Sequence, residues 1–60
     1  MDKIKKAKLL AKNYIENYPN LKSDINGLLS LMIDEILNGE SPNHEFELFT
    51  ESLNELVEQV

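Results

Sequence analysis

Two short interruptions, each containing a proline, divide this chain into three segments with a helical repeat of apolar residues. The first interruption is centred on Pro19, and the second runs from Gly39 to Pro42. In the segments around them, apolar residues recur at steps of three or four, which places them on one face of a helix. We therefore predict an all-α fold, a small bundle of three short helices in one domain. The expected domain is 1–60, and the expected helices are about 2–17, 20–38 and 42–59.

The residues at these interruptions are typical of helix ends. Pro19 disfavours helical geometry in the residue before it, and Asn20 is suited to cap the second helix. Gly39 accepts the left-handed conformation in which many helices end. Ser41 is a preferred N-cap residue, and Pro42 fits the first helical turn, where no partner for a backbone N–H is lost. The third helix is therefore expected to begin at these two residues.

The second helix carries more apolar surface than one buried face requires. Its apolar residues cover about 240° of the helical circumference, where one buried face needs little more than 100°. Two neighbouring helices can cover most of this arc, and a second copy of the chain is the alternative. Because 60 residues without cysteine bury little surface, we predict a homo-oligomer, at least a dimer. The expected interface residues are Leu9, Ser23, Gly27, Ser30, Leu31, Leu37 and Leu48.

Charge is unevenly distributed along the chain. Residues 1–24 hold all six lysines and three carboxylates, whereas residues 25–60 hold eight carboxylates and no lysine or arginine. Arginine, the side chain that most often forms hydrogen bonds to the edge of guanine, is absent from the sequence. We therefore expect no sequence-specific DNA binding. In the third helix an apolar stripe runs from Phe46 to Val60. The glutamates expected mostly on its other faces are Glu45, Glu47, Glu51, Glu55 and Glu58.

The sequence predicts neither a membrane span nor secretion. No run of residues approaches the roughly 20 apolar residues that cross a bilayer. The lysine-rich N-terminus lacks the apolar core of a signal peptide. We therefore expect a cytoplasmic protein.

No group of residues predicts an enzyme. His44 precedes Glu47 and Glu51 at helical spacing, but one histidine does not make a typical zinc site, so we interpret it as a residue of the capping region. Paired carboxylates would need a cleft with two different environments, which three short helices hardly provide. The two glycines do not form a phosphate-binding loop. We predict no catalytic residue, no metal and no cofactor.

Two tyrosines of the first helix suggest a second kind of site. Tyr14 and Tyr18 are one helical turn apart, near Lys8 and Lys12. Together they would form a platform that stacks on a nucleotide and attracts its charge. Packing in the core is the alternative for tyrosines on an apolar stripe. A small anionic signalling nucleotide is therefore one predicted ligand, and a host protein is the other.

Residues 31–59 combine an acidic helix that ends in glycine, a Glu-Ser corner, and a helix that begins with HEFEL and ends rich in leucine. This pattern resembles small acidic helical proteins encoded by early genes of bacteriophages. The resemblance implies a non-enzymatic binding protein that acts by occupancy. Its target would be a host protein or a defence signal, and its location the host cytoplasm. The alternative is a small cellular helical adaptor or regulatory interaction module.

Overall fold

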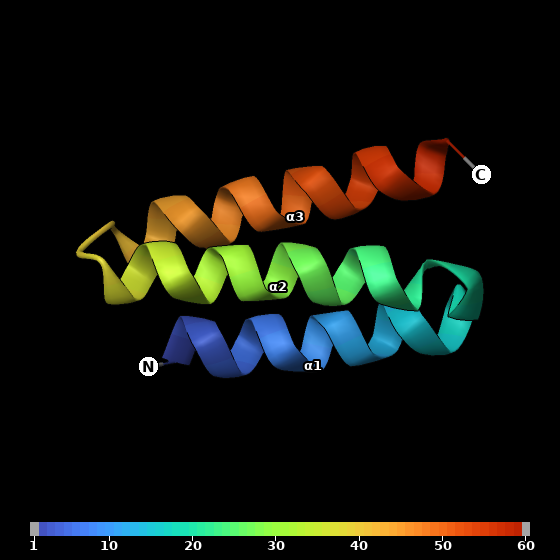
Figure 1. Ribbon diagram of the computed structural model, residues 1–60, viewed down its shortest axis with the longest axis horizontal. Helices are drawn as coiled ribbons and strands as arrows, with labels where there is room; N and C mark the ends of the chain where they lie inside the picture. Colours follow the sequence, from blue (N-terminus) through green and yellow to red (C-terminus); the bar gives the residue numbers. More distant parts are fainter. Residues whose placement is uncertain (1, 60) are drawn as a thin grey trace.

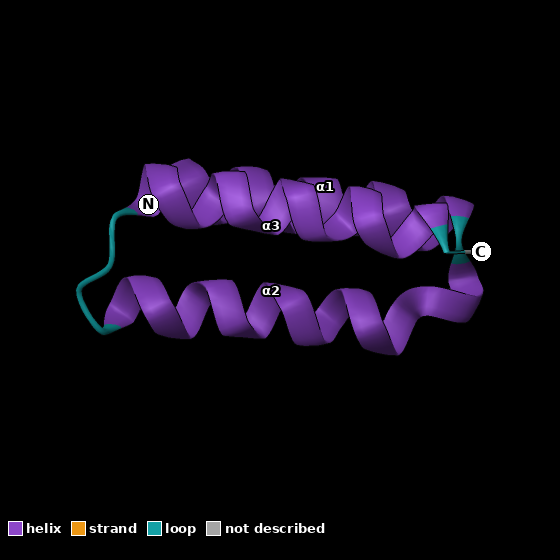
Figure 2. Cartoon of the chain, turned by 90° about the horizontal axis from the view of Figure 1, so that it is seen from above, coloured by secondary structure: helices purple, strands orange, loops and turns teal. Residues whose placement is uncertain are grey.

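The computed structural model describes residues 2–59 and confirms the all-α bundle. Its helices run alternately in opposite directions, with α2 between the other two in Figure 1, while Figure 2 shows α2 on one side of α1 and α3. All three helices contact one another in a bundle of 32 × 18 × 15 Å. The elements are α1 (Asp2–Asn17), the 3-10 helix η1 (Pro19–Leu21), α2 (Lys22–Leu37) and α3 (Pro42–Glu58). Val60, the last residue of the predicted third stripe, lies outside the described residues.

The first corner contains a turn of 3-10 helix that the sequence did not predict. Tyr18 leaves the helical region, with φ −134° and ψ 67°, as expected for a residue before proline. The N–H of Leu21 then donates to the carbonyl of Tyr18 at 2.9 Å. Leu21 is the N-cap residue of α2 and makes no side-chain capping bond. The expectation that Asn20 caps this helix is wrong, because Asn20 lies inside the 3-10 turn.

The second corner begins at Gly39, as predicted. This glycine has φ +104°, a conformation that residues with a Cβ rarely adopt. Its N–H donates to the carbonyl of Ile36, and the N–H of Glu40 donates to the carbonyl of Glu35, both at 3.0 Å. These two bonds form a Schellman motif, which satisfies carbonyls that the end of α2 would leave unpaired.

The predicted cap of α3 is also confirmed. The N–H of His44 donates to the hydroxyl oxygen of Ser41 at 3.4 Å, and Pro42 is the first helical residue. The distance is long for a hydrogen bond, so this contact is a weak one. His44 itself is exposed and takes part in the cap through its backbone.

The core is small and draws on all three helices. The contribution of α1 is two alanines, Ala7 and Ala11, so this helix approaches its neighbours through small side chains. Half-buried residues, among them Leu10 and Tyr14 of α1, pack around the core. The fully packed set is Ala7, Ala11, Ile25, Met32, Phe49 and Leu53.

Candidate functional site

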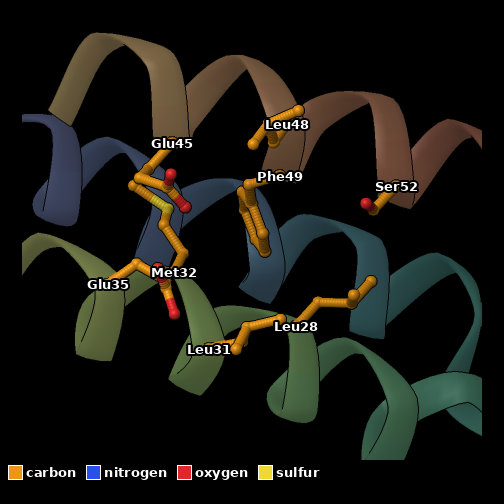
Figure 3. A pocket seen from close by; sticks show the side chains of 8 residues that line it. All are labelled: Leu28, Leu31, Met32, Glu35, Glu45, Leu48, Phe49 and Ser52. Carbon is orange, nitrogen blue, oxygen red and sulfur yellow. The ribbon is translucent and has the colours of Figure 1, made fainter. Parts of the chain in front are cut away.

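A groove opens between α2 and α3, and in the close view of Figure 3 the ribbon of α1 passes behind it. The two helices are antiparallel, so each wall presents residues at three- and four-residue steps along the same line. The groove has a volume of about 350 Å³. Its lining residues are Leu28, Leu31, Met32 and Glu35 of α2 and Glu45, Leu48, Phe49 and Ser52 of α3.

Two leucines stand exposed on opposite walls of this groove. Leu31 of α2 is 58% exposed and Leu48 of α3 is 43% exposed. Met32 and Phe49, both buried, lie deeper between the walls, and Figure 3 shows Phe49 reaching across between the two helices. Apolar side chains that are grouped in a concave surface are typical of a binding site, whereas single exposed leucines are ordinary.

Two carboxylates lie at one end of the groove. Glu45 is buried, with 9% exposure, and Figure 3 shows it beside Met32, with Glu35 on the facing helix. The glutamates of α3 are predicted to lie mostly on its other faces. Glu47, Glu51, Glu55 and Glu58 are exposed, and Glu45 is the exception. Glu45 precedes Phe49 by four residues, so the two side chains share the face that meets α2.

The groove continues toward the other end of the two helices. A second hollow of about 390 Å³ shares Leu28 and Ser52 with the first. Gly27 is among its lining residues, and a Cβ added there would lie more than 4 Å from every atom beyond the glycine's chain neighbours and the nearby backbone of its own helix. No contact inside the bundle therefore requires a glycine at this position. The lining residues of this second half are Ser23, Asp24, Gly27, Leu28, Ser52, Glu55, Leu56 and Gln59.

The groove brings together four of the seven residues predicted for an interface, namely Ser23, Gly27, Leu31 and Leu48. The other three do not line it. Leu9 is 65% exposed on α1, Leu37 is 68% exposed at the C-terminal end of α2, and Ser30 is exposed on α2. Self-association stays a prediction.

Two contacts that the sequence did not predict hold α1 against α3. The hydroxyl of Tyr14 donates to the Oδ1 atom of Asn54 at 3.0 Å. The ammonium of Lys3 lies over the ring of Phe46, 4.9 Å from its centroid, which is a cation–π geometry. Neither contact follows from the spacing within one helix, because each depends on which residues of the neighbouring helix come opposite.

The predicted nucleotide platform has its tyrosines together but its lysines apart. The rings of Tyr14 and Tyr18 are 6.3 Å apart and tilted by 34°. At 100° per residue, the exposed Lys8 and Lys12 lie about 120° around the helix from the tyrosine pair. Tyr14 is also half-buried against the core. The structure thus supports the structural role of Tyr14, and the nucleotide platform stays a prediction.

Within residues 2–59, no group of three or more histidine, cysteine, aspartate or glutamate side chains is placed to hold a metal ion. No helix in that range is long and apolar enough to cross a membrane. Comparison with protein families, curated proteins and solved structures gives no match. The resemblance to phage proteins therefore stays an expectation, and a function is proposed from the groove and its charge.

Proposed function

We propose that this chain is a non-enzymatic binding protein that acts by occupancy, with the groove between α2 and α3 as its binding surface. The observation that supports this is the exposure of Leu31 and Leu48 on facing walls above the buried Phe49. Burying a leucine side chain fully gains roughly 1.5–3 kcal/mol, so a partner that covers both leucines gains a useful part of its binding free energy there.

The resemblance of residues 31–59 supports an inhibitor or sequestering protein of phage type, directed at a host protein or a defence signal in the host cytoplasm. Of these two targets, the groove favours a protein. The half around Leu31 and Leu48 is lined mainly by apolar side chains, and the charged residues of both halves are carboxylates, which repel the phosphates of a nucleotide. A nucleotide ligand would instead use the lysines of α1 and Tyr18, the residue that follows this helix.

Affinity capture from a bacterial lysate tests this proposal. We expect the wild-type protein to retain a protein partner that the double variant Leu31→Ser/Leu48→Ser does not retain, because the variant lacks the apolar walls. The matched control is Leu9→Ser, which changes an exposed leucine outside the groove and should capture as the wild type does. Equal capture by all three proteins, or capture by none, would contradict the groove as the binding surface.

We also propose that two copies cover each other's groove when no partner is present. Such pairing brings carboxylates together, so we expect it to strengthen as salt screens their repulsion. Light scattering at rising salt should show the mass increasing from 6.9 kDa toward twice that value. Leu31→Glu should hold the mass at 6.9 kDa, and Leu9→Glu should not. A wild-type mass that stays at the monomer value at all salt concentrations would show that the bundle needs no second copy.

A further inference from the structure

All charged residues that line the groove are negative. Its two halves are lined by four carboxylates, those of Asp24, Glu35, Glu45 and Glu55, and by no lysine, arginine or histidine. Asp24 and Glu55 belong to one half, and Glu35 and Glu45 to the other. The exposed leucines lie between these two acidic ends. A ligand that fits must therefore offer apolar groups at its centre and positive charge near both of its ends.

The length and direction of the groove suit a helix. On α2 the lining extends from Ser23 to Glu35, which at 1.5 Å per residue is about 18 Å, or a little over three helical turns. An amphipathic helix that lies along such a groove inserts a side chain every three or four residues. Each turn of the guest would thus meet one pair of wall residues.

Gly27 gives this groove a place for close approach. A glycine within a helix costs about 1 kcal/mol relative to alanine. No neighbouring helix comes within 4 Å of the position that a Cβ of residue 27 would take, so no close contact inside the bundle accounts for the glycine. The neighbouring lining residues Ser23 and Ser52 are also small. A guest backbone can approach here more closely than at the leucines.

We propose that the groove takes a basic amphipathic α-helix of a partner protein. This inference rests on the proposed function and names the chemical class of the partner. A second copy fits less well, because two grooves face to face would oppose four carboxylates with four more. The chain's own lysines do not line either half of the groove. Lysines or arginines on both flanks of a leucine stripe complement all four acidic residues at once.

Two synthetic peptides of about 14 residues, or four helical turns, test the proposal by titration calorimetry. Both carry leucines on one helical face, and the polar face is lysine in one and glutamate in the other. We expect the lysine peptide to bind and the glutamate peptide not to bind. Raising the salt from about 0.05 to about 0.5 M should weaken the lysine peptide by tenfold or more, because exposed charges are screened. The lysine peptide should also return any dimer to the monomer mass.

Matched variants locate the binding. Leu31→Ser should weaken the lysine peptide about tenfold, and Leu9→Ser should leave it unchanged. Glu35→Gln with Glu55→Gln should weaken it about threefold to tenfold. Glu47→Gln with Glu51→Gln changes the net charge by the same amount as that double variant. Neither residue lines the groove, so the affinity for the lysine peptide should stay unchanged. All four variants alter residues outside the buried core, and circular dichroism should show an unchanged helix content.

The outcomes separate the two proposals. If both peptides bind equally and Leu31→Ser weakens both, the groove binds helices without regard to charge, which overturns this inference and leaves the proposed function standing. If Leu31→Ser does not affect binding of the lysine peptide, the peptide binds to acidic residues outside the groove, which also overturns the inference. If the lysine peptide does not dissociate the dimer, the occupant of the groove is a second copy of the chain, and this inference is overturned. If neither peptide binds and no partner is captured through the groove, both proposals fail.

Discussion

Leu53→Ala should lower the free energy of unfolding by about 2–5 kcal/mol, the range measured for large-to-small changes in protein cores. Leu53 is fully buried in α3 and belongs to the core shared by all three helices. At about 0.05–0.15 kcal/mol per residue, a chain of this length has only some 3–9 kcal/mol of stability in total. One truncated leucine therefore removes a large share of it. Urea denaturation followed by far-ultraviolet circular dichroism measures the loss.

The matched control for this substitution is Leu9→Ala. Leu9 is 65% exposed on α1, so its truncation should change the free energy of unfolding by no more than about 0.5 kcal/mol. If the two variants lost equal stability, Leu53 would not occupy a packed core, and the arrangement of α3 against the other helices would be wrong.

Ala7→Leu should lower the free energy of unfolding by about 1–3 kcal/mol, although it adds an apolar side chain to an apolar stripe. Ala7 has no exposed surface, and it lies where α1 meets the other two helices. The three added carbon atoms have no space there, so the helices must move apart or leucine must adopt a strained rotamer. Thermal denaturation should show the loss as a lower midpoint.

Lys8→Leu is the control for Ala7→Leu, because it places the same side chain at the adjacent, exposed position of α1. Its effect on the free energy of unfolding should stay within about 0.5 kcal/mol. A gain in stability from Ala7→Leu, with Lys8→Leu neutral, would contradict the close approach of α1 and show that the interior has unfilled space.

The helices and most of their ends could be predicted from the sequence because their causes are local. The three- and four-residue spacing of apolar residues requires only the geometry of one helix. Gly39 ends α2 through its own backbone preference, and Ser41 caps α3 through a bond to a residue three positions away. The first corner was predicted less well. A 3-10 turn replaced the expected cap at Asn20, since the chain has to reverse direction within a few residues after Pro19.

The groove could be predicted only in part. The sequence indicated Leu31 and Gly27 as interface residues of α2, and both line the groove. It did not indicate that Leu48 comes opposite Leu31, nor that Glu45 is buried beside Met32. Each of these depends on how α3 is rotated about its own axis against α2, which the period of one helix leaves open.

By itself, then, the sequence determined the number of α-helices, their approximate bounds and the acidic character of α2 and α3. The tertiary structure decided which part of the wide apolar arc of α2 is covered. Most of it packs against α1 and α3, while Leu31 and Leu37 stay exposed. The reason is geometric. Two helices that pack on a third cover its circumference only where the side chains of all three fit together. The buried residues of α1 in this packing are Ala7 and Ala11.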